Sequence, residues 1–269
     1  MRMNEKGQMV APATCKMSAA DFETKCGTSV YWLGGGGAMI NSHGTILMID
    51  PVMEGFDMPL LIDVPILPQE VPRVDGVLIS HSDGDHFSRV TCKKMKAVCK
   101  EYHTTHYVAS LMKEECSIDG WGHDIGDHIR VDDIDIELTP ADHAWQRMFE
   151  IYNYRTWEDN ECCGFYLRTP DAKIWYPGDS RLMDCHLHMD PPDVILFDFS
   201  DNFAHIGLKN SYKLANTYPD AKLVLIHWGT IDAPDDDPFN GNPQNVIDNV
   251  VNPHRVIILA PGQEYKIEV

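Results

Sequence analysis

Four side chains of the kinds that bind metal ions lie within six residues, directly after an apolar run. The run Val74–Ile79 has the composition of a buried strand, and His81, Asp83, Asp85 and His86 follow it. Imidazole and carboxylate groups suit hydrolytic zinc, manganese and iron, and a strand that runs into a loop holds them on a rigid base. A polar turn between a strand and a helix would not need a histidine at both ends. The segment therefore predicts a metal site.

Three further candidate ligands lie far along the chain, and each comes at the end of an apolar strand pattern. His143 follows an alternating pattern near Ile134, Asp179 follows the run that ends at Tyr176, and His227 ends the run 221–227. A single histidine at a strand end is more often a core or surface residue than a ligand. Together with the first segment, these residues supply what a two-metal site needs.

This set of motifs resembles the metallo-β-lactamase superfamily, whose order is H-x-H-x-D-H, then a distant His, a bridging Asp and a final His. The resemblance covers roughly residues 29 to 269. The pair Asp50-Pro51, the segment 204–206 and the segment 227–230 are similar to the branch that contains ascorbate-6-phosphate lactonases and N-acyl-phosphatidylethanolamine phospholipase D. The resemblance implies an α/β fold of αββα type, with two mixed sheets between layers of helices.

The resemblance also implies the ligand set and the reaction. One metal ion would be held by His81, Asp83 and His143, a second by Asp85, His86 and His227, with Asp179 bridging both. Two divalent ions at this spacing share a hydroxide with a lowered pKa and polarise a carbonyl or phosphoryl oxygen. Asp85 and Asp179 are also candidates to orient or deprotonate the attacking water. Metal-assisted hydrolysis of a small ester, lactone or phosphodiester is the leading expectation.

Asp83 departs from the family pattern, which has a histidine at this position. A carboxylate adds a negative charge and an oxygen ligand, which shifts the site from zinc towards manganese or iron, although zinc remains an option. Alternatively, the shorter side chain does not reach the metal and leaves the first site weak or absent.

His205 is the candidate for a residue that contacts substrate without binding metal, and it follows the apolar run Val194–Phe197. An imidazole there could protonate a leaving group or bind a phosphate; the alternative is a histidine with no catalytic role. The aromatic and charged insert after His143 is expected to form a flap over the substrate, or else a dimer contact or a plain aromatic cluster. Expected substrate contacts in the flap and in the motifs are Arg147, Arg155, Asn202 and Trp228.

The length and the spread of the motifs predict a single domain over residues 1–269, with residues 1–28 as a polar leader. Helices are expected near 92–101, 109–115, 212–217 and 243–251. A hairpin is expected from the strand runs 29–33 and 45–49, and a turn at 169–172 should return the chain to Asp179.

The formal net charge of −19 argues against a protein that grips nucleic acid, because such binding uses clustered Lys and Arg. Bound metal ions can still attract a small anionic substrate. The sequence has no apolar run long enough for a membrane span and no secretory signal, and its eight cysteines lack metal-type spacing. A reduced cytoplasmic protein is the resulting expectation. The acidic segment 232–238 is expected to be a solvated loop near the mouth of the pocket.

Two other classes of function stay open at this point. A carboxylate at position 83 also occurs, as Glu, in the di-iron oxidoreductases of the superfamily, and such a protein would need a separate redox partner. The other alternative is a non-catalytic metal-binding protein, against which the complete set of ligands argues.

Overall fold

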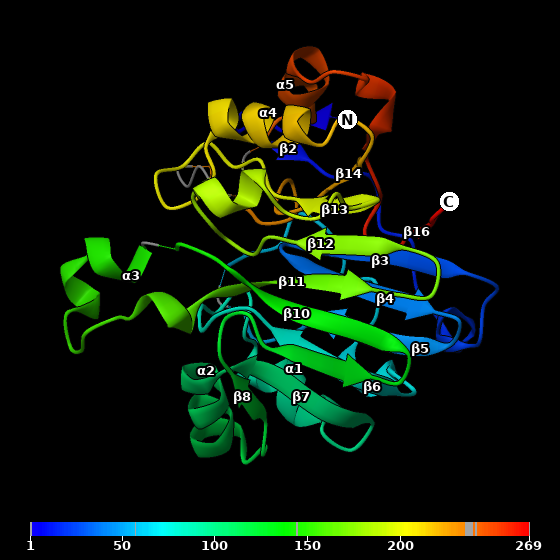
Figure 1. The fold of residues 1–269 in the computed structure, drawn as a ribbon, viewed down its shortest axis with the longest axis vertical. Helices are drawn as coiled ribbons and strands as arrows, with labels where there is room; N and C mark the ends of the chain where they lie inside the picture. Colours follow the sequence, from blue (N-terminus) through cyan, green and yellow to red (C-terminus); the bar gives the residue numbers. More distant parts are fainter. Residues whose placement is uncertain (1, 57, 144, 235–238, 240, 269) are drawn as a thin grey trace.

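Two mixed seven-stranded sheets pack face to face in the computed structural model, with helices on their outer faces (Figure 1). The structure describes residues 2–268 apart from residues 57, 144, 235–238 and 240. The predicted arrangement of two mixed sheets between helix layers is confirmed. Within the described residues, no helix combines the length and the apolar character that a membrane span requires.

The first sheet has the strand order β16-β3-β4-β5-β6-β7-β8. Its strands run antiparallel from β16 to β5 and parallel from β5 to β8. Their bounds are β3 Thr28–Gly34, β4 Gly37–Ser42, β5 Thr45–Ile49, β6 Val74–Ile79, β7 Cys99–Thr105, β8 Trp121–His123 and β16 Glu264–Lys266.

The second sheet repeats this pattern with the order β15-β14-β13-β12-β11-β10-β9. Its strands are antiparallel from β9 to β12 and parallel from β12 to β15. Their bounds are β9 His128–Val131, β10 Ile134–Pro140, β11 Cys163–Arg168, β12 Lys173–Tyr176, β13 Val194–Phe197, β14 Lys222–Leu225 and β15 Val256–Ile257.

The helices divide between the two outer faces. The helices α1 (Arg89–Met95) and α2 (His106–Leu111) pack on the first sheet, while α4 (Leu208–Thr217) and α5 (Pro243–Asn249) lie on the second sheet (Figure 1). The short helix α3 (Trp145–Met148) belongs to the insert after β10, which projects beyond the sheets. We call residues 145–162 the flap.

Strand alternation explains the layers. In β3, Val30 and Trp32 enter the core between the two sheets, whereas Tyr31 and Leu33 face the core under α1 and α2. Successive side chains of a strand point to opposite faces, so a strand that is apolar throughout must be covered on both sides.

Two expectations about local structure were wrong. The expected hairpin is a three-stranded meander, because β4 occupies most of the segment between the two strand runs. The expected helix at 92–101 ends at Met95, and β7 begins at Cys99, where pairing with β6 outweighs the weak helical pattern. In the polar leader, Met9–Val10 forms strand β2, which pairs with β1 (Arg2–Met3), and the amide of Ala11 donates to the carbonyl of Gly229 at 2.8 Å.

The topology gathers several strand ends at one edge of the molecule. Strands β12, β13 and β14 are parallel, and β10 runs in the same direction because both β10 and β12 are antiparallel to β11. Their carboxyl ends therefore share an edge, where the flap also begins. The turn at 169–172 forms as expected, with the Thr169 amide donating to the Ala172 carbonyl at 2.9 Å.

Candidate metal centre

The first motif lies in a short loop between two rigid elements. Strand β6 ends at Ile79, and α1 begins after Ser88, whose hydroxyl accepts a hydrogen bond from the amide of Thr91 at 3.0 Å. The amide of His86 donates to the carbonyl of Asp83 at 3.0 Å, which closes the loop into a turn. The candidate ligands are thus held on a framework with little freedom.

A first group of donor atoms comes from His81, Asp83 and His143, all within 4.8 Å of one another. The Asp83 carboxylate lies 3.1 Å from Nε2 of His143 and 3.6 Å from Nε2 of His81. Asp83 therefore occupies the position between the two imidazoles, so its shorter side chain does reach the group.

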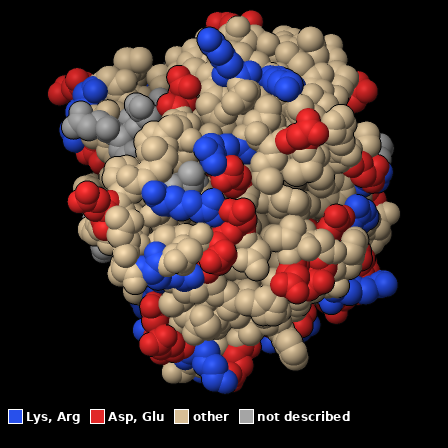
Figure 2. Space-filling view, turned by 60° about the vertical axis from the view of Figure 1, so that its left-hand side comes forward, with Lys and Arg blue, Asp and Glu red and all other residues tan. Residues whose placement is uncertain are grey.

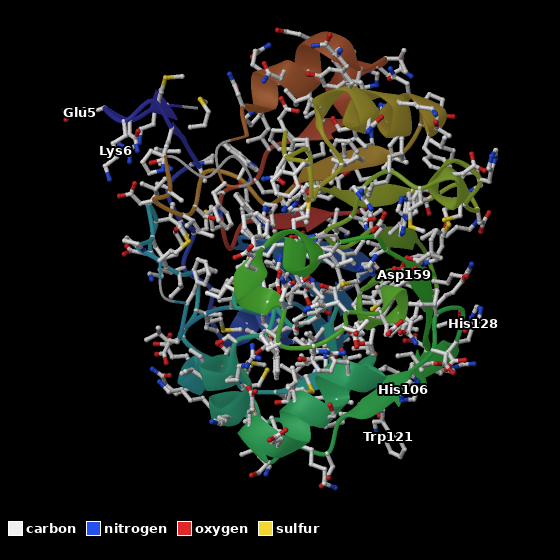
Figure 3. All side chains as sticks on the ribbon, turned by 90° about the vertical axis from the view of Figure 1, so that its left-hand side faces the viewer. Glu5, Lys6, His106, Trp121, His128 and Asp159 are labelled. Carbon is white, nitrogen blue, oxygen red and sulfur yellow. The ribbon has the colours of Figure 1, made fainter. Side chains whose placement is uncertain are left out.

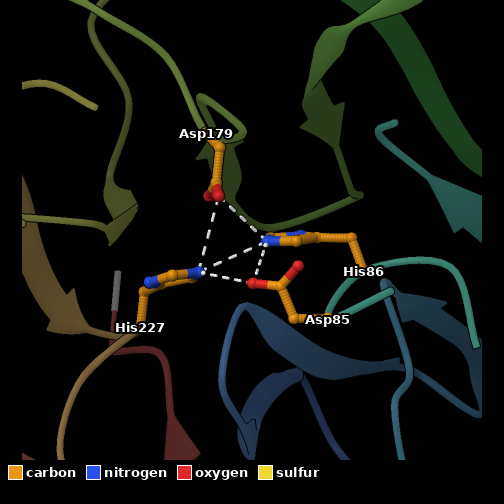
Figure 4. A group of neighbouring side chains, drawn as sticks. All are labelled: Asp85, His86, Asp179 and His227. Atoms are coloured by element: carbon orange, nitrogen blue, oxygen red, sulfur yellow. Dashed lines mark hydrogen bonds and ion pairs between the residues drawn. The ribbon is translucent and has the colours of Figure 1, made fainter. Parts of the chain in front are cut away.

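A second group comes from Asp85, His86, Asp179 and His227 (Figure 4). Nε2 of His86 lies 3.0 Å from the Asp179 carboxylate and 3.3 Å from Nε2 of His227. The Asp85 carboxylate lies 3.5 Å from Nε2 of His227. Four donors converge on one small volume, as a metal ion with nitrogen and oxygen ligands requires.

Asp179 connects the two groups. Besides its place in the second group, it shares a third set of donors with His143 and His205, again within 4.8 Å. His143 belongs to the first group, so the carboxylate of Asp179 can reach ions in both positions.

Asp50 fixes His86 from behind. Its carboxylate lies 2.8 Å from Nδ1 of His86 and accepts hydrogen bonds from Tyr176 Oη at 2.6 Å and from the Ser80 amide at 2.7 Å. A carboxylate on one imidazole nitrogen sets the tautomer and aims the other nitrogen at the metal position. We had not assigned Asp50 to the site, although an aspartate directly after an apolar strand was a usable signal.

The chemistry of these donors fits bound cations. Nε2 of His81 is buried and makes no hydrogen bond within the described residues, while its Nδ1 lies 2.8 Å from the Ser80 hydroxyl. A buried polar nitrogen without a partner costs free energy, and a metal ion at this position would satisfy it.

Electrostatics favours positive charge at the same place. Burial raises the pKa of Asp179, but His227, His86 and His205 outweigh burial and hold that pKa well below its ordinary range. Burial lowers the pKa of His227, yet Asp179 and Asp85 raise it to about 9. The carboxylates thus keep the neighbouring imidazoles protonated. Metal cations bound instead of these protons would balance the same negative charge of the carboxylates.

Gly36, between β3 and β4, allows the backbone to approach His86. A Cβ at this position would lie 2.4 Å from Cε1 of His86, and the neighbouring Gly35 carbonyl accepts from the His227 amide at 2.8 Å. The glycine run therefore lets the backbone lie close against a candidate ligand.

His205 lies beside the two donor groups, as expected from the strand that precedes it. Its Nδ1 is 2.8 Å from the carboxylate of Asp198, and its Nε2 is 3.6 Å from the carboxylate of Asp179. Asp198 therefore orients the ring so that Nε2 faces the centre.

A cavity of about 440 Å³ opens over these groups. Asp83, Asp85, His143, Asp179 and His205 form its base. The flap supplies one wall through Trp145, Gln146, Tyr152, Tyr154 and Trp157, and Figure 3 views the molecule from the side on which the flap projects. The volume lies in the usual range for small-molecule sites.

The two flap arginines, which we predicted as substrate contacts, pair with carboxylates of the flap. Arg147 pairs with Asp159, and Arg155 pairs with Glu161 and stacks 3.8 Å from the ring centroid of Tyr107. Neither lines the cavity.

The other two predicted substrate contacts also lie outside the cavity lining. Trp228 is 1% exposed and stacks on Trp32 with 5.8 Å between ring centroids, so it belongs to the core. The side chain of Asn202 accepts from the amide of Ala204 at 2.7 Å and shapes the loop before His205, outside the cavity lining. Of the acidic segment expected at the pocket mouth, residues 235–238 lie outside the described residues.

Several polar residues of the cavity were missed, and two of them lie beside the candidate ligands. Arg89 begins α1 directly after the motif loop, and Gln146 contacts the Asp83 carboxylate from the flap. The position of Arg89 next to the motif was a signal in the sequence. The position of Gln146 was no such signal, because Gln146 contacts a residue 63 positions away in the sequence.

Comparisons with known proteins agree with this geometry. The family model of the beta-lactamase superfamily domain matches residues 45–228. A metal-dependent hydrolase from Caldivirga maquilingensis is 22% identical over 245 residues, which cover 88% of this chain and 97% of the relative. An N-acyl-phosphatidylethanolamine-hydrolyzing phospholipase D from Caenorhabditis elegans is 23% identical over 244 residues, covering 80% of this chain and 67% of the relative. Among solved structures, a metallo hydrolase from Ignicoccus hospitalis shares the fold with a TM-score of 0.70 at 16% identity, over 90% of this chain and 99% of its own.

Proposed function

The chain belongs to the beta-lactamase superfamily as a metal-dependent hydrolase of the metallo-β-lactamase type, and we propose that it acts through two metal ions at the base of the cavity. The observation that carries this proposal is the position of Asp179. Its carboxylate belongs to one set of donors with His86 and His227 and to another with His143. A carboxylate with two oxygens in this position suits a bridge between two ions.

We assign the ligands by donor group. His81, Asp83 and His143 would hold one ion, Asp85, His86 and His227 would hold the other, and Asp179 would contact both. When bound, two divalent ions lower the pKa of a water molecule and polarise the carbonyl or phosphoryl oxygen of a substrate. Asp83 makes the first position richer in oxygen, which favours manganese or iron there, with zinc as the third candidate.

The protein's own groups then handle protons. Asp85 lines the cavity and can accept a proton from the attacking water. His205, held by Asp198, can carry a proton on Nε2 and deliver it to the leaving oxygen. The reaction is hydrolysis of a small ester, lactone or phosphodiester; the name of the Caenorhabditis elegans relative, which states hydrolysis of a phospholipid, supports this range.

Metal analysis combined with a substrate panel tests the proposal. Protein depleted of metal is reloaded with manganese, zinc or iron(II), its metal content is measured, and hydrolysis of 4-nitrophenyl butyrate, γ-butyrolactone and bis(4-nitrophenyl) phosphate is followed. We expect two ions per chain and metal-dependent hydrolysis of at least one probe. Asp179→Ala should lose activity and at least one ion. Two retained ions in this variant would show that Asp179 is not the bridge.

A di-iron oxidoreductase is a second candidate, which only the oxygen ligand at Asp83 favours. Such a protein would consume oxygen with a reductant when loaded with iron(II) and would hydrolyse none of the probes. Two bound ions with neither activity would favour a non-catalytic metal-binding protein.

A further inference from the structure

The walls of the cavity carry almost no free positive charge. Arg89 is the only Lys or Arg among the described residues that line it, and the undescribed residues of the chain include neither type. Nε of Arg89 donates to Glu115 at 2.7 Å, and its Nη1 donates to the carbonyls of Ser82 and Phe87, both at 3.0 Å. Glu115 also lines the cavity, so the pair contributes no net charge to it.

The flap repeats this arrangement. Arg147 and Arg155 are each paired with a carboxylate of the same segment, Asp159 and Glu161. On the face shown in Figure 2, Lys and Arg side chains lie beside Asp and Glu side chains, and no broad basic area is visible. An anionic substrate group therefore finds no unpaired guanidinium in the walls, although such groups are the usual partners of phosphates and carboxylates.

Apolar surface takes the place of charge at the mouth of the cavity. Trp145 lines the cavity and lies 4.6 Å from Phe149 and 6.0 Å from Phe203, measured between ring centroids. Phe149 is 38% exposed and Phe203 is 48% exposed. Phe203 lies two residues before His205, so this aromatic cluster, Trp145, Phe149 and Phe203, is continuous with the site. Exposed apolar surface at such a place marks a binding surface.

The opposite part of the flap is also aromatic. Trp157 makes edge contacts with Tyr107, Tyr152 and Tyr154 at ring-centroid distances of 5.7, 6.3 and 5.9 Å. All four residues line the cavity. Arg155 lies over Tyr107 and Trp157, at 3.8 and 4.7 Å from the ring centroids, and the remaining ring surface is suited to contact with a planar or branched apolar group.

From these observations, and resting on the proposed hydrolysis, we infer that the substrate is an uncharged carboxylic ester or lactone with an aromatic or other large apolar group. That group lies against the aromatic cluster while the carbonyl carbon faces the metal positions. Water adds to this carbon, the carbon–oxygen bond to the alcohol breaks, and the alcohol oxygen receives a proton. The inference departs from the phospholipid in the name of the Caenorhabditis elegans relative.

A series of esters that share the same leaving group distinguishes the effect of charge on the acyl group from the effect of its size. We compare 4-nitrophenyl acetate, butyrate, 3-phenylpropionate and hemisuccinate, the last being a butyrate-like chain that ends in a carboxylate. The expected order of kcat/KM is phenylpropionate, butyrate, acetate and then hemisuccinate. Trp145→Ala and Phe203→Ala should lower kcat/KM for phenylpropionate by roughly tenfold, as expected for lost contact with one ring, and for acetate by less than about twofold. Trp145→Phe should retain most of the kcat/KM for phenylpropionate that Trp145→Ala loses.

Binding without turnover gives a second measurement. Titration of the metal-loaded protein with N-phenylbutanamide and N-phenylsuccinamate, followed by tryptophan fluorescence, compares a neutral ligand with its charged counterpart. We expect the neutral amide to bind at least about tenfold more tightly. Glu115→Gln releases Arg89 from its partner and should raise the hemisuccinate-to-butyrate ratio of kcat/KM by about 3- to 10-fold.

The outcomes separate this inference from the proposed function. If the loaded protein hydrolyses neither the esters nor γ-butyrolactone nor bis(4-nitrophenyl) phosphate, the hydrolysis proposal fails, while the amide titration still decides which ligands the cavity prefers. Hydrolysis of the phosphodiester without hydrolysis of any ester or lactone would overturn the inference and leave the hydrolase intact. Equal use of butyrate and hemisuccinate with equal binding of the two amides would overturn the inference and leave the hydrolase intact. If the Trp145 and Phe203 variants change only the oligomeric state or vesicle binding, the aromatic cluster contacts a second copy or a lipid surface, and the inference is also wrong.

Discussion

Gly36→Ala adds a single methyl group directly behind a metal ligand. The new Cβ would lie 2.4 Å from Cε1 of His86, 3.0 Å from its Nδ1 and 3.2 Å from Oη of Tyr176. Carbon atoms pack best at about 3.5–4.0 Å, so the His86 ring must move by about 1 Å. Gly36 does not have a positive φ, so alanine itself is not strained there and the effect comes from this contact.

A shift of this size removes His86 from its donor group. The ring is fixed by Asp50 at 2.8 Å and faces Asp179 at 3.0 Å, whereas metal–ligand distances tolerate about ±0.2 Å. We expect metal affinity at the second position to fall by at least roughly 10- to 100-fold. Overpacking should cost about 1–3 kcal/mol of stability. The first donor group, which does not contact Gly36, should keep its ion.

The assay is the number of ions per folded chain, measured by mass spectrometry after dialysis at a fixed free metal concentration. Wild type should hold two ions and Gly36→Ala one. Gly84→Ala is the matched control, because its Cβ would meet only Cδ2 of Phe56, at 4.0 Å, although Gly84 lies inside the metal loop. Two ions in folded Gly36→Ala, with unchanged affinity, would refute the placement of His86 as a ligand.

Three further predictions address single groups. Asp83→His should move the metal preference towards zinc, since an imidazole replaces an oxygen ligand; an unchanged ratio of manganese- to zinc-supported activity would show that Asp83 is no ligand. His205→Asn should lower kcat by roughly 100-fold or more with both ions retained, whereas loss of an ion would make His205 a ligand. Burial lowers the pKa of His103 to about 4, below its value of about 6.5 in the unfolded chain. The contribution of neutral His103 to stability is therefore present near neutral pH, and it is lost as the pH falls through about 6.5 towards 4. His103→Gln should therefore reduce the acid-induced loss of unfolding free energy by about 1–2 kcal/mol, measured by urea unfolding at about pH 7 and about pH 4.5; equal losses in both proteins would exclude this contribution.

The candidate ligands could be found from the sequence because each follows a strand of clear pattern. Parallel strands place their carboxyl ends at one edge of a sheet, so Asp179 and His227 had to lie at a common edge once their strands were recognised. His81 follows a strand of the other sheet, and its approach depends on how the two sheets pack. The strands that escaped recognition lack this pattern. Strand β7 carries Lys100, Glu101 and His103 and is held by its neighbours rather than by its own periodicity.

The sequence by itself determined many of the strands, the donor types and their order along the chain, because strand periodicity and ligand chemistry are local properties. The αββα class of fold came from the resemblance to the superfamily that these motifs carry. Only the tertiary structure decided how charges are paired. Arg89 meets Glu115 across 26 residues, and His86 meets Asp50 across 36. Such contacts depend on how distant segments pack, and no local pattern encodes them.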